Sequence, residues 1–248
     1  MLKFIILGVI QGVTEFLPVS SSGHLVILQH IFGVSEKELA IALILHLGTL
    51  LSLVVFFYKE IIGALRDRQK ILLIIIVTAA TGIIALSAKD FFESLFNDIK
   101  PVGISLFVTG IMLVLTKFIN TGIKRDSISK KDSLLMGIVQ GIAIIPGISR
   151  SGSTISALLF RGIDRKAAFS FSFLASIPAI LGAFILEFKE VEFGIKGDAL
   201  SMCAGLFFSF ICGIASLWLL KRVLIKDKLH YFGYYCIILS IVVLMYIK

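Results

Sequence analysis

Gly-Val-Ile-Gln-Gly-Val-Thr-Glu-Phe-Leu-Pro-Val-Ser-Ser-Ser-Gly-His, residues 8–24, is the stretch that decides the fold. It places a carboxylate, three consecutive hydroxyls and an imidazole inside an otherwise apolar region. In a helix over residues 8–17 every polar or bare position except Thr14 lies on one face, because Gly8, Gln11, Gly12 and Glu15 are spaced i, i+3, i+4 and i+7. That face must contact protein or water rather than lipid.

The same pattern recurs 129 positions later without a gap. Eight residues are identical at this offset: Gly8/Gly137, Gln11/Gln140, Gly12/Gly141, Ser20/Ser149, Ser22/Ser151, Gly23/Gly152, Gly33/Gly162 and Lys37/Lys166. We therefore predict an internal duplication of about half the chain. The copies differ where the chemistry gathers, because Glu15 corresponds to Ile144, Ser21 to Arg150 and His24 to Ser153. One copy supplies the acid and the imidazole, and the other supplies the guanidinium.

The composition is that of a membrane protein, with a mean hydropathy of +1.02 and 58% hydrophobic residues. Six apolar runs are long enough to cross a bilayer: 39–58, 71–88, 101–119, 167–186, 199–220 and 229–247. Two further apolar regions, 2–33 and 134–162, are broken at the centre by Pro, Ser and Gly, which is typical of re-entrant helical hairpins. We therefore predict an all-α integral membrane protein, with six transmembrane helices and two hairpins in one domain over residues 1–248.

Each predicted repeat, 1–119 and 134–247, holds one hairpin and three spans. An odd number of crossings inverts the second copy relative to the first. The loops 59–70, 120–133 and 221–228 hold four Lys or Arg each, whereas 89–100 and 187–198 hold two each. The basic loops are therefore expected in the cytoplasm and both termini outside. Orientation and anionic lipid explain the net charge of +8, so we expect no nucleic-acid partner.

Serines lie at both hairpin tips, where the second half-helix of each hairpin would begin. Helix capping alone would account for one such tip. Two tips that face each other, with Arg150 on one of them, favour a phosphate or diphosphate, because helix N-termini and guanidinium groups bind phosphate oxygens. The residues predicted to bind substrate are Ser20, Ser22, Gly23, Ser149, Ser151, Gly152 and Ser153.

Glu15 is costly inside hydrocarbon, by about 2.5 kcal/mol or more, unless a partner compensates its charge. One reading is an ion pair with Arg150 that only locks the hairpins together. The other places a divalent cation, Mg²⁺ or Ca²⁺, between Glu15 and the phosphates, with Gln11 as a second, neutral ligand.

His24 follows Ser21 by three residues, close enough to take a hydroxyl proton or to attack phosphorus itself. The nucleophile is left open between Ser21, His24 and a metal-bound water. His46 is assigned equally to the pocket and to an interhelical hydrogen bond.

Residues 14–24 and 146–154 closely resemble the two signature motifs of the bacitracin-resistance type of undecaprenyl-diphosphatase, over nearly the full length of the chain. The resemblance implies a membrane phosphatase of bacterial envelope synthesis that is divalent-cation dependent. It would hydrolyse undecaprenyl diphosphate in the plasma membrane and recycle the lipid carrier. The implied catalytic residues are Glu15, Ser21, His24 and Arg150. This chain departs from the pattern at Gln11, where many members carry Glu, which leaves one carboxylate for a metal.

A transporter or flippase for polyprenyl phosphates is the alternative, because inverted repeats with broken helices are also a transporter plan. Glu15 and His24 argue against it, since translocation of a phosphate needs neither an acid nor an imidazole. The expected partners are the polyprenyl diphosphate and the lipid bilayer, and a homodimer is considered as the assembly.

Overall fold

The computed structural model describes residues 1–32, 39–119, 125–190 and 199–246, and these residues fold almost entirely into helices. In chain order they are α1 (Leu2–Phe16), α2 (Ser21–Phe32), α3 (Leu39–Phe56), α4 (Tyr58–Leu65), α5 (Arg68–Ser87), α6 (Lys89–Ser94), α7 (Ile99–Leu115), α8 (Lys130–Ile142), α9 (Arg150–Phe160), α10 (Arg165–Glu190), α11 (Ala199–Ile225) and α12 (His230–Tyr246). The duplication pairs that involve Gly33 and Lys37, and most of the predicted loop 187–198, lie outside the described residues.

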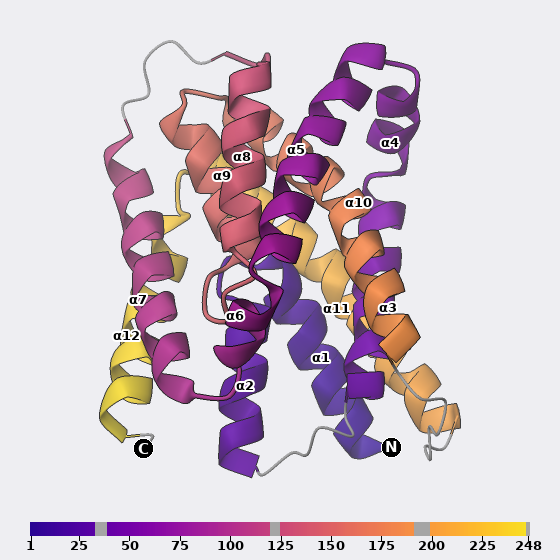
Figure 1. Cartoon of the computed structure of the whole chain (residues 1–248), viewed down its shortest axis with the longest axis vertical. Helices are drawn as coiled ribbons and strands as arrows, with labels where there is room; N and C mark the ends of the chain where they lie inside the picture. Colours follow the sequence, from indigo (N-terminus) through magenta and orange to yellow (C-terminus); the bar gives the residue numbers. More distant parts are fainter. Residues whose placement is uncertain (33–38, 120–124, 191–198, 247–248) are drawn as a thin grey trace.

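Two helix–turn–helix units enter the molecule from opposite ends and meet at mid-height (Figure 1). The first, α1 and α2, rises from the end that carries the N-terminus, and the second, α8 and α9, descends from the other end. The breaks predicted in 2–33 and 134–162 are present, because α1 stops at Phe16 and α8 at Ile142. The second unit begins four residues earlier than predicted, since Ser129 and Asp132 form a capping box at its start.

Among the described residues, four helices are long and apolar enough to cross a membrane: α5, α7 with its short extension to Phe118, α10 over Arg165–Leu186, and α11. A fifth candidate is α3 with α4, which are bent by 72° at Phe57. Helix α12 is a shorter apolar helix. Several predicted loops contain helix instead: α4 occupies much of 59–70, α6 lies in 89–100, and α10 and α11 continue into 187–198 and 221–228. Lys and Arg favour helix in these segments and can extend toward water.

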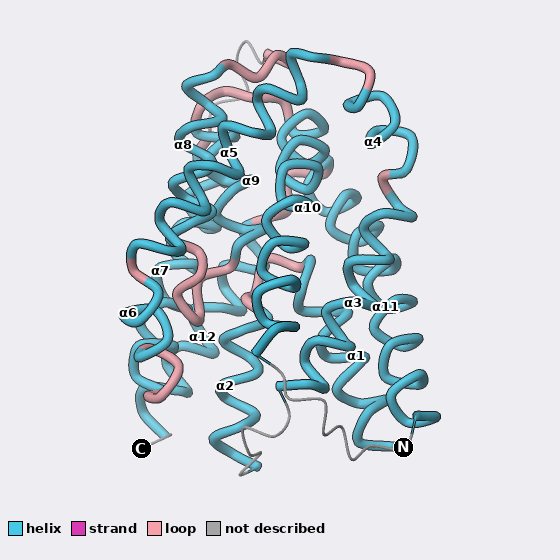
Figure 2. Tube along the Cα trace, turned by 45° about the vertical axis from the view of Figure 1, so that its right-hand side comes forward, coloured by secondary structure: helices cyan, strands magenta, loops and turns pink. Residues whose placement is uncertain are grey.

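The half-helices are inserted between longer helices through close backbone contacts. Helix α1 packs on α11 and helix α8 on α5, while α7 packs on α12 (Figure 2). A Cβ added at Gly12 would lie 2.6 Å from the Ser209 carbonyl oxygen, and one at Gly137 would lie 2.8 Å from the Val77 carbonyl oxygen. Only glycine permits such an approach, which brings the tips of both hairpins into the interior.

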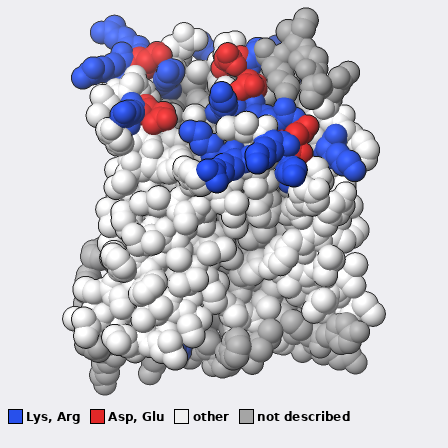
Figure 3. Space-filling view, turned by 180° about the vertical axis from the view of Figure 1, so that it is seen from behind, with Lys and Arg blue, Asp and Glu red and all other residues white. Residues whose placement is uncertain are grey.

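Lys and Arg side chains gather at one end of the molecule, above a broad belt that is free of charged groups on the face shown in Figure 3. This end carries α4, the start of α8 and the exposed residues Lys221, Arg222, Lys226 and Lys228. The N-terminus and the end of α12 lie at the opposite end (Figure 1). The described parts of the three predicted basic loops therefore share one side.

Asp132 fastens the second hairpin at this charged end. Its carboxylate is fully buried and accepts two hydrogen bonds from Arg125, at 2.7 and 2.8 Å, and one from Arg161 Nε at 3.0 Å. Burial alone would raise the pKa of Asp132, but the hydrogen bonds from Arg125, Ser129 and Arg161 together hold it well below its usual range. Because Arg161 follows α9 and Asp132 begins α8, the carboxylate ties together the two ends of the hairpin.

Replacing Asp132 by Asn is expected to lower the free energy of unfolding by about 3 kcal/mol at pH 7, because two arginines lose a buried anionic partner. A depressed folded-state pKa contributes stability above the unfolded pKa, near 4, and this contribution is lost as the pH falls through the folded value. The difference between wild type and Asp132→Asn should therefore shrink below about pH 4. Denaturant unfolding in detergent measures it. Asp126→Asn, at an exposed position in the same connection, is the control, and equal stability of both variants at pH 7 would contradict the assignment.

Candidate active site at the hairpin tips

The two tips are built by serine caps in equivalent positions. Ser20 Oγ accepts a hydrogen bond from Gly23 N at 3.2 Å, and Ser149 Oγ accepts one from Gly152 N at 3.1 Å. Both serines are buried. Each serine hydroxyl caps the helix that follows it, so the capping that we considered for a single tip is present at both tips. The N–H groups that follow each cap point the positive end of a helix toward the centre of the molecule.

The tips also bind each other directly. Gly147 N donates to Ser20 Oγ at 3.1 Å, and Ser151 Oγ donates to the Leu17 carbonyl at 3.5 Å. Ser20 has a left-handed backbone with a φ of 68°, which turns its hydroxyl toward the other tip. Two neighbouring helices brace the tips: Thr109 of α7 bonds to the Gly147 carbonyl and to Ser149 N, and the Cys236 thiol of α12 lies 3.6 Å from the Pro18 carbonyl.

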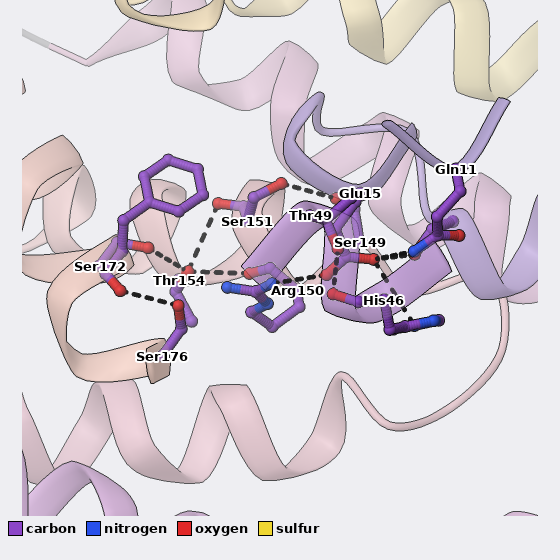
Figure 4. A network of polar contacts seen from close by, with 12 residues as sticks. Gln11, Glu15, His46, Thr49, Ser149, Arg150, Ser151, Thr154, Ser172 and Ser176 are labelled. Atoms are coloured by element: carbon purple, nitrogen blue, oxygen red, sulfur yellow. Dashed lines mark hydrogen bonds and ion pairs between the residues drawn. The ribbon is translucent and has the colours of Figure 1, made fainter. Parts of the chain in front are cut away.

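Glu15 is the centre of the polar cluster (Figure 4). Its Oε1 accepts from Arg150 Nη2 at 2.8 Å, although the two residues are 135 positions apart. Its Oε2 accepts from Ser21 Oγ at 2.8 Å and from Gln11 Nε2 at 3.1 Å. The carboxylate thus receives donors from α1, α2 and α9, and opposite charges from the two hairpins meet at one point.

Arg150 has a hydrogen-bond donor that its contact with Glu15 does not use. Its Nη1 is buried and has no hydrogen-bond partner among the residues that the structure describes, while Nη2 is used by Glu15. Arg150 is also the first residue of α9, so the guanidinium and the helix N-terminus contribute positive charge in one place. A buried guanidinium with a free edge is suited to a phosphate oxygen.

His46 of α3 approaches the same carboxylate, with Nε2 3.9 Å from Glu15 Oε2. Its Nδ1 lies 2.9 Å from the Ala42 carbonyl, which can only accept, so Nδ1 carries a proton. The Nε2 atom therefore faces Glu15. Of the two roles that the sequence left equal, the described contacts favour the pocket, because the hydrogen bond of Nδ1 stays within α3 while Nε2 lies beside the cluster.

His24 faces another neighbour. Its Nδ1 lies 2.8 Å from the Ser20 carbonyl and its Nε2 lies 2.7 Å from the hydroxyl of Tyr235, on α12. The described hydrogen bond of the Ser21 hydroxyl goes to Glu15, not to His24. A pairing of His24 with Ser21 therefore stays a prediction.

The other predicted substrate-binding residues surround the tips without contacting Glu15 in the described contacts. Ser22 Oγ lies 3.3 Å from Ser20 Oγ, and Ser151 Oγ lies 3.3 Å from Ser149 Oγ. Ser153 donates back to the Ser149 carbonyl. Gly23 and Gly152 matter by their small size, since a Cβ on either would come within 3.0 Å of the opposite tip.

An open groove reaches the cluster between α1, α2 and α3. Its lining includes Gln11 and Ser21 together with the apolar side chains of Leu7, Ile10, Leu25, Leu28 and Leu45. One polar corner within an apolar channel is suited to a ligand with a charged head and an apolar chain.

The donor set around Glu15 fits a divalent cation only in part. Among the described residues, no group of three or more His, Cys, Asp or Glu side chains could hold a metal ion. Glu15, the Gln11 amide and His46 supply one negative ligand and two neutral ones. Mg²⁺ is typically held by one or two carboxylates and by substrate phosphates, so these residues fit a cation that shares its ligands with the substrate.

Comparison of the sequence with known proteins assigns the chain to a family. The model of the family described as bacitracin resistance protein BacA matches residues 4–242. The chain belongs to the BacA family. Its relatives include the undecaprenyl-diphosphatase of Alkaliphilus metalliredigens, 45% identical over 98% of both chains, and that of Carboxydothermus hydrogenoformans, 43% identical over 97% of this chain and 95% of the relative. The undecaprenyl-diphosphatase of Methanococcus maripaludis strain C6 is 39% identical over 98% of this chain and 99% of the relative.

The sequence did not identify several residues that support this BacA-family site. Thr109 and Tyr235 lie in apolar helices, where the sequence does not indicate their partners. Thr154 ends the second motif, and its contact with Ser172, which joins α9 to α10 at 2.7 Å, was not predicted. The same polar network continues to Ser176, which donates to the Phe173 carbonyl (Figure 4). An isolated hydroxyl every few residues in a span could have indicated interhelical contacts, but not which partner each would meet.

Replacing Ser20 by Ala is expected to lower the free energy of unfolding by about 2 kcal/mol, because one buried oxygen caps α2 and accepts from the other tip. Ser22→Ala is the matched control and should cost less than about 1 kcal/mol, since its hydroxyl has one long described contact. Thermal unfolding in detergent compares the two. Equal losses would show that the inter-tip hydrogen bond contributes nothing.

Proposed function

We propose that the chain is an integral membrane phosphatase that removes the terminal phosphate from a polyprenyl diphosphate, with undecaprenyl diphosphate as the substrate. The products are the monophosphate carrier and inorganic phosphate. Family membership and the names of the relatives support this activity. They agree with a cluster that combines a carboxylate, a hydroxyl and a guanidinium inside an apolar molecule.

The single observation that carries the proposal is the state of Arg150. A pair that served only to lock the hairpins would use the guanidinium on Glu15 fully, yet Nη1 is buried without a partner. Burying an unsatisfied donor costs free energy, which a bound phosphate oxygen would recover. Arg150 and the capped starts of α2 and α9 are therefore proposed to hold the diphosphate.

The geometry favours Ser21 as the nucleophile, because its hydroxyl already donates to a proton acceptor, Glu15, at 2.8 Å. In the first step the Ser21 oxygen bonds to the terminal phosphorus, the bond to the bridging oxygen breaks, and the serine proton passes to Glu15. The monophosphate carrier leaves. In the second step water attacks the phosphoserine while His24 Nε2 takes a proton from the water, and the bond from phosphorus to the Ser21 oxygen breaks as that oxygen recovers its proton from Glu15. His24 then passes its proton to the departing phosphate. Positioning and charge neutralisation supply most of the rate.

The apolar groove is proposed to hold the start of the polyprenyl chain. Its leucines come from α1, α2 and α3, and its polar corner is formed by Gln11 and Ser21, which both contact Glu15. A lipid could then reach the site sideways from the bilayer while its diphosphate faces Arg150.

We propose Glu15 and Gln11 as the residues that would hold a divalent cation, Mg²⁺ or Ca²⁺, with His46 nearby. When bound, the cation would neutralise charge on the diphosphate. In the structure the Gln11 amide nitrogen donates to Glu15 Oε2, so Gln11 would bind the cation through its carbonyl oxygen after the amide turns over.

The membrane arrangement proposed for this site is six spans and two re-entrant hairpins, as an inverted repeat of residues 1–119 and 134–247. Reciprocal packing supports it, since α1 of the first half lies on α11 of the second and α8 of the second lies on α5 of the first. The basic end would face the cytoplasm, with both termini outside in the plasma membrane. The proposed site is built within one chain, so a homodimer would carry two of them.

The decisive test is phosphate release from undecaprenyl diphosphate by purified protein in detergent. Wild type should release phosphate. Arg150→Ala should lose at least about 100-fold in kcat/KM, because a charge-assisted contact to the reacting phosphate is removed. His24→Ala should accumulate a phosphoserine that mass spectrometry detects at Ser21. A flippase without phosphatase activity would release no phosphate, because translocation breaks no phosphate bond. Full turnover in both variants would contradict the site assignment.

Exchanging the two charges separates catalysis from locking. The double variant Glu15→Arg with Arg150→Glu keeps an ion pair between the hairpins, so it should be more stable than Glu15→Arg alone. It should nevertheless remain inactive, because the guanidinium no longer faces the phosphate from the α9 terminus. Recovery of phosphate release in the exchanged protein would show that the pair is only structural.

Gln11→Glu is expected to strengthen divalent-cation binding by about 10-fold or more, because a second carboxylate joins Glu15. Isothermal titration of the cation into substrate-free protein measures this. Gln140→Glu, at the equivalent position of the second half, is the matched control and should leave the affinity unchanged. Unaltered affinity in Gln11→Glu would remove Gln11 from the cation site.

A further inference from the structure

The imidazole of His24 is held between two partners from different parts of the chain. Nδ1 lies 2.8 Å from the Ser20 carbonyl, and a carbonyl can only accept, so Nδ1 carries a proton. Nε2 lies 2.7 Å from the Tyr235 hydroxyl, 211 positions away. In the neutral ring Nε2 has a lone pair, so the tyrosine hydroxyl donates to it. The contact therefore favours one tautomer.

The two rings are also aligned with each other. The imidazole and the phenol planes differ by only 4°, with centroids 5.8 Å apart. The near-parallel rings and the 2.7 Å contact together fix the orientation of the imidazole relative to the phenol. Tyr235 thus restrains both the tautomer and the rotation of the His24 ring.

The turn of α12 that carries Tyr235 lies at the level of the hairpin tips. The neighbouring residue, Cys236, is fully buried and its thiol lies 3.6 Å from the Pro18 carbonyl at the first tip. Tyr235 itself is 45% exposed.

We propose that Tyr235 is a positioning residue of the phosphatase site, which holds His24 in the Nδ1-protonated tautomer before the reaction and gives up the single Nε2 lone pair when the attacking water binds. This inference rests on the proposed function. In the substrate-free protein the tyrosine hydroxyl occupies the place of the water at Nε2. When water binds, Nε2 takes a proton from the water, and the Tyr235 hydroxyl keeps its own proton.

The test compares Tyr235→Phe with Tyr234→Phe. Tyr234 is the matched control, because it is a neighbouring exposed tyrosine on the same helix that packs on His230 instead. Tyr235→Phe should lower kcat for phosphate release by roughly 10-fold with KM changed less than about 2-fold, as expected for the loss of one hydrogen bond to a catalytic group. Tyr234→Phe should match wild type.

A spectroscopic measurement reports on the ring independently of activity. In protein labelled with ¹⁵N-histidine, His24 is assigned by the signals missing from His24→Gln. Wild type should show a protonated Nδ1 and a hydrogen-bonded, unprotonated Nε2. In Tyr235→Phe the Nε2 signal should shift, and in Tyr234→Phe it should not.

Three outcomes would overturn the inference. An unshifted Nε2 signal in Tyr235→Phe, or a wild-type kcat in that variant, shows that Tyr235 only packs against His24. Full phosphate release by His24→Gln removes His24, and with it the role of Tyr235, from the reaction. If wild type releases no phosphate, the proposed function itself fails, and that result is distinct because the ¹⁵N signals still report whether Tyr235 fixes the ring.

Discussion

The contact between Glu15 and Arg150 is the interaction on which the rest of the molecule depends. Each side chain is mostly buried, with 11% and 16% of its surface exposed, and neither would be tolerated alone in an apolar interior. The two charges can neutralise each other only if the two hairpins bring the carboxylate and the guanidinium together, and Arg150 Nη2 lies 2.8 Å from Glu15 Oε1. Every other feature of the centre can be understood as a means of bringing these tips together.

Several contacts serve that purpose at different distances from the pair. The serine caps end the half-helices at fixed residues, and Ser20 adds a hydrogen bond to the opposite tip. Glycines let α1 and α8 approach α11 and α5 closely. At the charged end, Asp132 fixes the hairpin that carries Arg150. A phosphate site needs this rigidity, because small displacements of positioned charges weaken transition-state stabilisation.

Much of this arrangement could be predicted from the sequence, because it follows from composition and local chemistry. Pro18 with the serines of both tips predicted the broken helices, and the 129-residue offset predicted that Glu15 and Arg150 come from corresponding stretches. The partners of individual side chains could not be predicted. Tyr235 and Thr109 are single polar residues in apolar helices, and their contacts depend on how helices rotate and slide against one another. The bend at Phe57 likewise depends on packing rather than on a proline or glycine.

A double-mutant cycle on Glu15 and Arg150 tests the central contact most directly. The free energies of unfolding of wild type, Glu15→Gln, Arg150→Met and the double variant would be measured in the same detergent. The account predicts a coupling energy of at least about 2 kcal/mol, because each single variant leaves the other charge buried without its partner. Additive effects within about 0.5 kcal/mol would contradict the contact and, with it, a site assembled from both hairpins.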